Sequence, residues 1–306
     1  MQPFFMLMRR EFWENRTAML KAPLYTALII GALVLLSTVL GIGRHSKFSF
    51  TVNNHNLQLQ NASVEVMLYI VSLPLVILMI VNTLLYLLNT LFDDRQDRSI
   101  LFWKSLPATD LATVLSKLAT AIILIPFWSF ISIIVLQIIS LIIGTIFTWH
   151  TQTISLTILW NPLHLIRVWA YLWLSFINQA LWLLPIFSWC LLVSAYVKKN
   201  PLLYAILIPA LLCLLERIIL GSSLLYHTIS ARFTGLFKIW TTAEFHSYNL
   251  TFNTRTLQPT ESYLSNNLNH LLFQLTHSTF WYGVIFTLIC LIITVGLRKY
   301  RYEIHG

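Results

Sequence analysis

The chain has 306 residues, of which 57% are hydrophobic and only 10% are charged, and its formal net charge is +9. Because a soluble domain carries about 25% charged residues, this composition excludes an ordinary soluble fold. The basic residues are spread over several segments and do not form one stripe with interleaved aromatic residues, which argues against a nucleic-acid partner. The sequence therefore predicts a single all-α integral membrane domain over residues 1–306.

Six apolar runs approach or exceed the roughly 20 residues that a helix needs to cross the hydrocarbon of a bilayer. The predicted spans are 22–42, 64–92, 118–147, 166–197, 202–226 and 279–297. The third run could instead break into two short helices at Pro126, which would reverse the side of every later segment. The fifth run is the weakest, because its apolar part from Pro201 to Leu215 then meets Glu216 and Arg217.

Lys and Arg residues indicate the orientation, because cytoplasmic loops hold an excess of them. Most of the 20 Lys and Arg residues fall before the first span, in segment 93–117, at Lys198 and Lys199, and after the sixth span. This distribution also argues against a break at Pro126. It predicts a multi-pass membrane protein with both termini in the cytoplasm.

Segment 1–21 predicts an amphipathic helix at the membrane surface. Its apolar arc consists of Phe4, Phe5, Met8 and Phe12. Arg9 and Arg10 lie outside this arc, where they would meet the anionic headgroups of membrane lipid. The alternative is an irregular basic leader that only fixes the topology.

Segment 93–117 predicts a short cytoplasmic helix between the second and third spans. Asp97 can cap this helix, Pro107 would end it, and Thr109 and Asp110 then start the third span. The helix would expose large apolar side chains among charges, as protein-docking surfaces do. The alternative is that its aromatic residues anchor in the membrane interface. The predicted docking residues are Asp97, Arg98, Ile100, Leu101, Phe102, Trp103 and Lys104.

Polar residues inside the spans are candidates for a translocation path, because they are costly in hydrocarbon unless they face water or a partner. The candidates are Asn82, Asn89, Asn178, Gln179, Glu216 and Arg217. The alternative is structural, with hydrogen bonds between helices for the amides and anchoring for the charged pair.

The outer segment 227–278 contains one helical apolar face, formed by Phe233, Leu236, Phe237 and Trp240. This face predicts either a re-entrant helix in the outer leaflet or a packed loop helix. The three cysteines lie inside apolar runs and the histidines show no tight ligand spacing, so no metal site is predicted. No catalytic constellation can be argued from spacing either, and we do not expect an enzyme.

Three segments resemble those of bacterial ABC-2-type transporter permeases, namely 9–14 (RREFWE), 93–107 (DDRQDRSILFWKSLP) and 113–117 (TVLSK). The resemblance implies a type-2 ABC exporter fold, with an elbow helix at about 4–20, a coupling helix at about 97–106 and a re-entrant element after Glu216. It also implies a permease homodimer that pairs with two copies of a separate ABC ATP-binding subunit. The outer loops match no family pattern, so the resemblance does not identify the substrate.

These observations lead us to expect the permease subunit of an ABC exporter that moves an amphipathic or lipid-like substrate across the inner membrane. The chain lacks a Gly-x-x-x-x-Gly-Lys-Ser/Thr loop for ATP phosphates. ATP and Mg²⁺ would therefore be bound by the partner subunit, and this chain would bind no cofactor. Two alternatives stay open: a membrane-embedded enzyme acting on lipid, and an ATPase-driven membrane regulator that does not transport.

Overall fold

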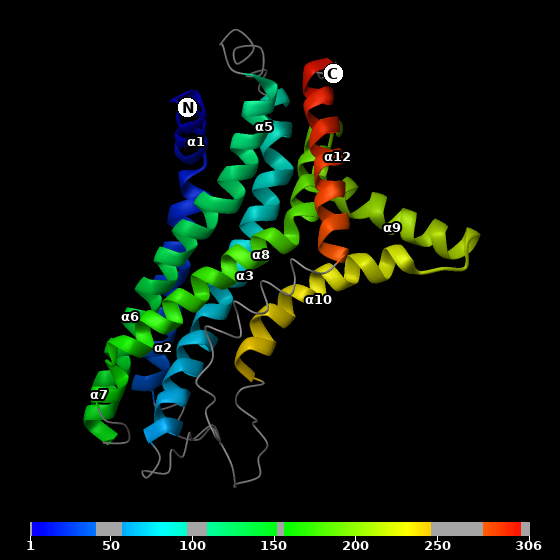
Figure 1. Ribbon diagram of the computed structural model, residues 1–306. Coiled ribbons are helices and arrows are strands. Elements are labelled where there is room, and N and C mark those ends of the chain that lie inside the picture. The colour runs from blue at the N-terminus through cyan, green and yellow to red at the C-terminus, as the bar shows by residue number, and fades with distance from the viewer. Residues whose placement is uncertain (1, 41–56, 97–108, 152–155, 246–277, 301–306) are drawn as a thin grey trace.

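The protein is described by a computed structural model over residues 2–40, 57–96, 109–151, 156–245 and 278–300 (Figure 1). Every element within these residues is helical, and no strand occurs among them. The elements are α1 (Gln2–Glu14), the π-helical turn η1 (Thr17–Lys21), α2 (Ala22–Val39), α3 (Leu57–Gln96), α5 (Asp110–Ala119), the π-helical turn η3 (Thr120–Leu124), α6 (Ile125–Thr151), α7 (Leu156–Leu159), α8 (Pro162–Tyr196), α9 (Pro201–Ile219), α10 (Leu224–Phe245) and α12 (Ser278–Tyr300).

Six stretches of helix are long and apolar enough to span a membrane: Thr17–Val39, Met67–Gln96, Asp110–Trp149, Leu165–Tyr196, Pro201–Ile219 and Ser278–Tyr300. The prediction of an all-α chain is therefore confirmed over the described residues, as is the presence of six helices long and apolar enough to cross a membrane. Helical structure continues through Pro126, so the third run is one helical stretch and does not break in two. The fifth helix ends at Ile219 rather than at 226, and residues 220–223 turn the chain into α10.

Capping side chains explain where several helices begin. Thr109 Oγ1 accepts a hydrogen bond from Ala112 N at 3.2 Å and starts α5, and Asn161 Oδ1 accepts one from Leu163 N at 3.1 Å and starts α8. Asn200 has a φ of 49°, in the left-handed region that Asn tolerates better than most residues. This residue turns the chain between α8 and α9.

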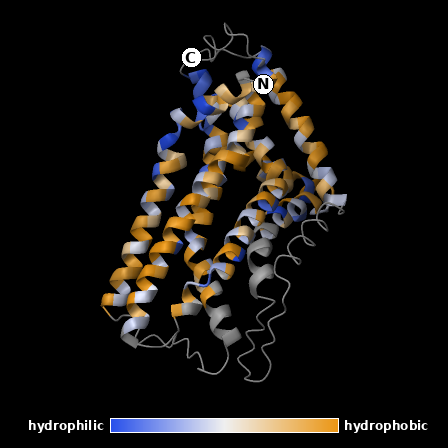
Figure 2. Ribbon diagram, turned by 60° about the vertical axis from the view of Figure 1, so that its left-hand side comes forward, coloured by the Kyte–Doolittle hydropathy of each residue, from blue (hydrophilic) through white to orange (hydrophobic). Residues whose placement is uncertain are grey.

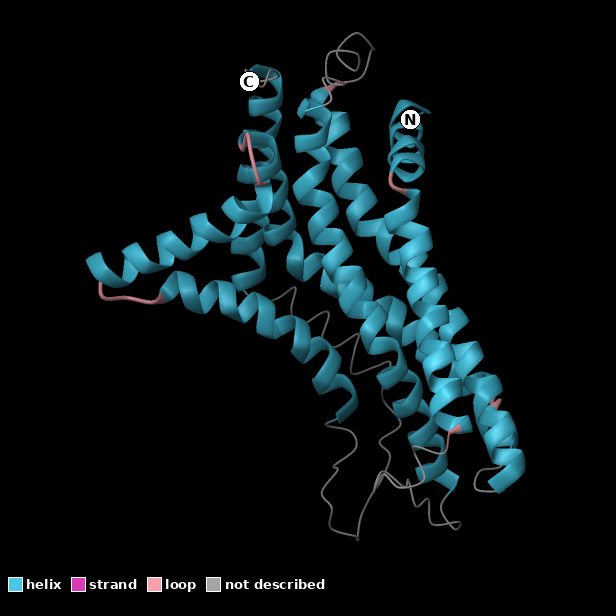
Figure 3. Cartoon of the chain, turned by 180° about the vertical axis from the view of Figure 1, so that it is seen from behind, coloured by secondary structure: helices cyan, strands magenta, loops and turns pink. Residues whose placement is uncertain are grey.

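The helices form an elongated bundle with a side arm (Figure 1). Within the bundle, α3 packs against α6 and α8, α2 packs against α6, and α12 packs against α8. Helices α9 and α10 form a hairpin that stands out from the side of the bundle (Figure 3). Helix α1 begins and α12 ends at the same end of the bundle, where hydrophilic residues gather, whereas most of the remaining ribbon consists of hydrophobic residues (Figure 2).

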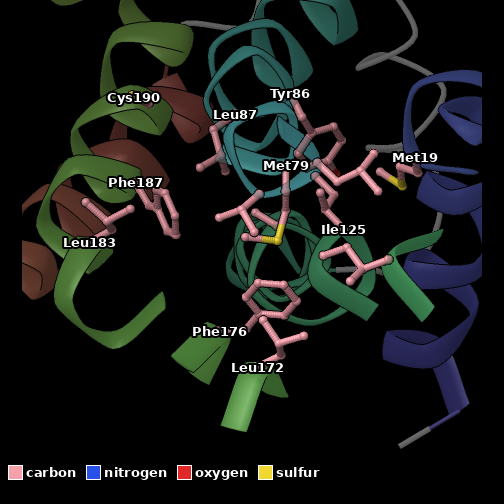
Figure 4. Close-up of a cluster of buried hydrophobic side chains, with 14 of the residues drawn as sticks. Met19, Met79, Tyr86, Leu87, Ile125, Leu172, Phe176, Leu183, Phe187 and Cys190 are labelled. Atoms are coloured by element: carbon pink, nitrogen blue, oxygen red, sulfur yellow. The ribbon is translucent and has the colours of Figure 1, made fainter. Parts of the chain in front are cut away.

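The core lies where α3, α6 and α8 meet (Figure 4). Leu87 of α3 and Leu172 of α8 are fully buried there, as is Ile125 at the start of α6. Because lipid is as apolar as these side chains, packing and polar contacts between helices must hold the bundle together. Gln137 makes such a contact, since its Nε2 donates to Leu68 O at 3.3 Å and its Oε1 accepts from Trp169 Nε1 at 2.8 Å.

Helix α1 has a different setting from the one expected for a helix lying on the membrane surface. It precedes α2 through η1 and packs beside α5 (Figure 1). Phe12, a member of the predicted apolar arc, stacks on Trp128 of α6 with ring centroids 5.3 Å apart. Phe5 is exposed, whereas Glu11, which lies outside the predicted arc, is buried. Part of the predicted lipid-facing arc therefore packs inside the protein.

Candidate functional site

Lys117 lies at the centre of a buried charged cluster. Its side chain is only 1% exposed, and its Nζ lies 2.9 Å from Glu11 Oε1 and 3.1 Å from Asp94 Oδ2. The same Nζ donates a hydrogen bond to Thr90 Oγ1 at 2.7 Å. One lysine thus joins α5 to both α1 and α3.

Glu11 is held by α3 as well. Its Oε2 accepts hydrogen bonds from Tyr86 Oη at 2.8 Å and from Thr90 Oγ1 at 3.4 Å. Tyr86, Thr90 and Asp94 follow one another at intervals of four residues, which places them on one face of α3. That face meets Lys117, which lies about two helical turns after the start of α5.

Arg298 extends the cluster to α12. Its Nε donates to Asp110 Oδ1 at 3.0 Å, and its Nη1 lies 3.5 Å from Asp94 Oδ2. On the other side, Arg10 Nη2 lies 3.9 Å from Asp94 Oδ1, and Arg10 Nε donates to Glu14 Oε1 at 2.6 Å. Each of the three cations therefore lies between two carboxylates.

We call this group the ion cluster: Arg10, Glu11, Glu14, Tyr86, Thr90, Asp94, Asp110, Lys117 and Arg298. Four of its charged members are buried, namely Glu11, Asp94, Lys117 and Arg298. Buried charges lose their hydration, and the alternation of sign offsets that loss. Removing one partner from a buried ion pair costs about 3–5 kcal/mol, because the other charge is left uncompensated. The ion cluster therefore holds α1, α3, α5 and α12 in one fixed arrangement.

Arg95 makes a second connection at the same end. Its Nη2 donates to Ser194 O at 2.5 Å and to Val197 O at 2.8 Å. In return, Ser194 Oγ accepts from the backbone N–H groups of Leu91 and Phe92 at 3.1 Å and 3.0 Å. The end of α8 is thereby joined to the end of α3, so five helices are connected at one end of the bundle.

The three segments that carry the family resemblance meet in the ion cluster. Glu11 comes from the first segment, Asp94 from the second and Lys117 from the third. Comparison with known protein families, curated proteins and solved structures finds no match for this chain. A function must therefore be argued from the sequence and from this site.

The predicted docking residues, from Asp97 to Lys104, lie outside the described residues. The helices on either side of them are described, since α3 ends at Gln96 and α5 begins at Asp110. Both of these helices contribute to the ion cluster. Over the described part of the chain, no group of three or more His, Cys, Asp or Glu side chains could hold a metal ion.

The amides predicted to line a path have different surroundings. Asn82 Nδ2 donates to Ala18 O of η1 at 2.7 Å, which is a contact between helices. Asn89 is exposed, whereas Asn178 and Gln179 are buried in α8. Asn178 Oδ1 accepts no hydrogen bond from the described residues. Asn178 thus keeps an unused acceptor inside the bundle and stays a candidate for the path.

Glu216 and Arg217 are neighbours in the sequence but have different surroundings. Glu216 is buried and caps the start of α10, where its carboxylate accepts from Ser222 Oγ at 2.7 Å, Leu224 N at 2.8 Å and Leu225 N at 2.9 Å. Arg217 is exposed on α9. These contacts favour the structural interpretation of Glu216, which holds the turn between the two helices of the hairpin.

Sequence reasoning identified no member of the ion cluster as a site residue except Arg10. Lys117 was counted with the cytoplasmic segment 93–117, because the apolar run of the third span begins at 118, although Thr109 and Asp110 were expected to start the helix. The helix begins eight positions earlier, at Asp110, after the Thr109 cap. The start signal at Thr109 and Asp110, followed by a cation seven residues into the helix, could have pointed to a buried Lys117.

Proposed function

We propose that this chain is the permease subunit of an ABC exporter, with segment 97–106 as the helix on which the ATP-binding subunits act. The observation that carries the proposal is the position of the ion cluster. It brings together residues from all three segments that resemble ABC-2-type permeases, and it joins the two helices on either side of segment 97–108.

A rigid attachment is what mechanical coupling requires. A force on segment 97–106 would reach α3 and α5 first. Because Lys117 and Asp94 fix these helices to each other, and Arg298 fixes α12 to both, the helices would move as a unit. Buried ion pairs resist stretching, so little of the displacement would be lost in local deformation.

In this proposal the chain makes and breaks no covalent bonds. Two copies form the permease dimer in the bacterial inner membrane, with both termini in the cytoplasm, and two ATP-binding subunits bind ATP and Mg²⁺. The substrate is amphipathic or lipid-like, in keeping with the weakly charged spans. Helix α10, which follows Glu216, is the re-entrant element in this proposal, and the tight turn that Glu216 holds before it supports that assignment.

Affinity purification in mild detergent tests the proposal. The tagged chain should bring down an ATP-binding protein in an equimolar amount, identified by mass spectrometry. The double variant F102E/W103E should lose this partner, because charged side chains would replace the aromatic docking surface. The matched control is W149E/W160E, which changes in the same way two exposed aromatic residues, one in the last turn of α6 and one directly after α7. Retention of the partner by F102E/W103E would refute the docking role of segment 97–106.

A further inference from the structure

Arg232 of α10 is a cation buried between helices. It is only 7% exposed, and no carboxylate of the described residues forms an ion pair with it. Its guanidinium instead donates to two backbone carbonyls, from Nη1 to Trp182 O at 3.0 Å and from Nη2 to Thr279 O at 2.5 Å. These carbonyls belong to α8 and α12, so one side chain joins three helices.

Trp182 and Arg232 are joined by a cation–π contact and by two hydrogen bonds. The guanidinium carbon of Arg232 lies 4.4 Å from the centroid of the Trp182 ring, a cation–π contact. Trp182 Nε1 donates to Arg232 O at 3.1 Å, while Arg232 Nη1 donates to Trp182 O. Each side chain therefore bonds to the backbone of the other residue. This reciprocal pair fixes both the position and the direction of the α10 backbone beside α8.

The neighbouring residues leave just enough space for the guanidinium. A Cβ atom at Gly283 would overlap Arg232 Nη2 and would lie 2.9 Å from Pro185 Cγ. Glycine is thus the residue that permits the approach of Arg232 to α12. Pro185 lies inside α8, where the missing backbone N–H permits a local bend.

We infer that Arg232 is a reversible latch that holds the α9–α10 hairpin against α8 and α12. When it docks, the guanidinium gives up water and receives only carbonyl dipoles and a ring face in exchange. When it leaves, no buried carboxylate of the described helices stays behind unpaired. The ion cluster differs in this respect, because opening it would strand buried charges of the opposite sign. The hairpin can therefore separate from the bundle while the ion cluster stays closed.

Hydrogen–deuterium exchange of the full chain in lipid nanodiscs tests the latch. The variant R232M keeps an unbranched apolar side chain and loses both carbonyl bonds. In the variant G283A, the added Cβ atom on α12 would displace the Arg232 guanidinium. Both variants should speed hydrogen exchange by about tenfold or more in residues 224–245 and 278–286, because the contacts of Arg232 with α8 and α12 would be lost or weakened. Exchange in residues 86–96 and 110–118, around the ion cluster, should stay unchanged.

The matched control is R217M, the same substitution at an exposed arginine of the same hairpin, which should leave exchange unchanged. If G283A does not fold, W182F serves instead, because it keeps a ring under the guanidinium and removes the Nε1 donor. W182F should raise exchange in the same peptides by a smaller factor. Unchanged exchange in R232M, or an equal rise throughout the chain, would overturn the inference. This test does not depend on an ATP-binding partner.

Discussion

Lys117 and Glu11 are 106 positions apart in the sequence, yet Lys117 Nζ lies 2.9 Å from Glu11 Oε1, with both side chains almost completely buried. The pair joins the first helix of the chain to the start of the third span. Asp94 also lies within ion-pair distance of Lys117, so the lysine pairs with two carboxylates from two helices. Lys117 therefore connects α1, α3 and α5.

The variant K117M should lower stability by about 3–5 kcal/mol, because it leaves Glu11 and Asp94 buried without their shared cation. A fall in the thermal unfolding midpoint in detergent measures this loss. The double variant E11Q/K117M should be less destabilised than the sum of the two single variants, because one of the stranded charges has also gone. K199M, which removes an exposed lysine, should leave the midpoint unchanged. Additive losses in the double variant would argue against a direct pair.

Features that depend on neighbouring residues could be predicted from the sequence, whereas contacts between residues far apart in the chain could not. The six spans depend on local apolar length, and the run through Pro126 was predicted correctly as one crossing. The pairing of Lys117 with Glu11 depends on which helices lie side by side, and periodicity within a single helix does not contain that information.

The hairpin turn gives a second prediction. The variant E216A should loosen the first turn of α10, because three hydrogen bonds to the Glu216 carboxylate are lost. Loss of such a cap costs about 0.5–2 kcal/mol. Faster hydrogen exchange in residues 224–228 would report it. E216Q should fall between the wild type and E216A, since the amide keeps one acceptor oxygen, and R217A should behave as the wild type. Equal effects of E216A and R217A would contradict the capping role.

Gly31 supports a third prediction, about the contact between α2 and α6. A Cβ atom at Gly31 would lie 2.9 Å from Ile139 Cγ2, closer than side chains tolerate. The variant G31A should therefore cost about 1–3 kcal/mol through overpacking, visible as a lower unfolding midpoint. The double variant G31A/I139A should recover part of that overpacking cost relative to I139A alone. The matched control is G296A, since a Cβ at Gly296 meets nothing within 4 Å. If the unfolding midpoint of G296A fell as far as that of G31A, the loss would come from the backbone and not from a steric clash.

Site-specific photo-crosslinking tests the central claim most directly. A photoreactive amino acid at position 102 should crosslink to an ATP-binding subunit in intact cells, whereas the same amino acid at position 149, an exposed position at the end of α6, should not. This outcome would place the force-receiving contact between the two helices that the ion cluster joins. Crosslinking of position 102 to lipid alone, with no protein partner, would contradict the account.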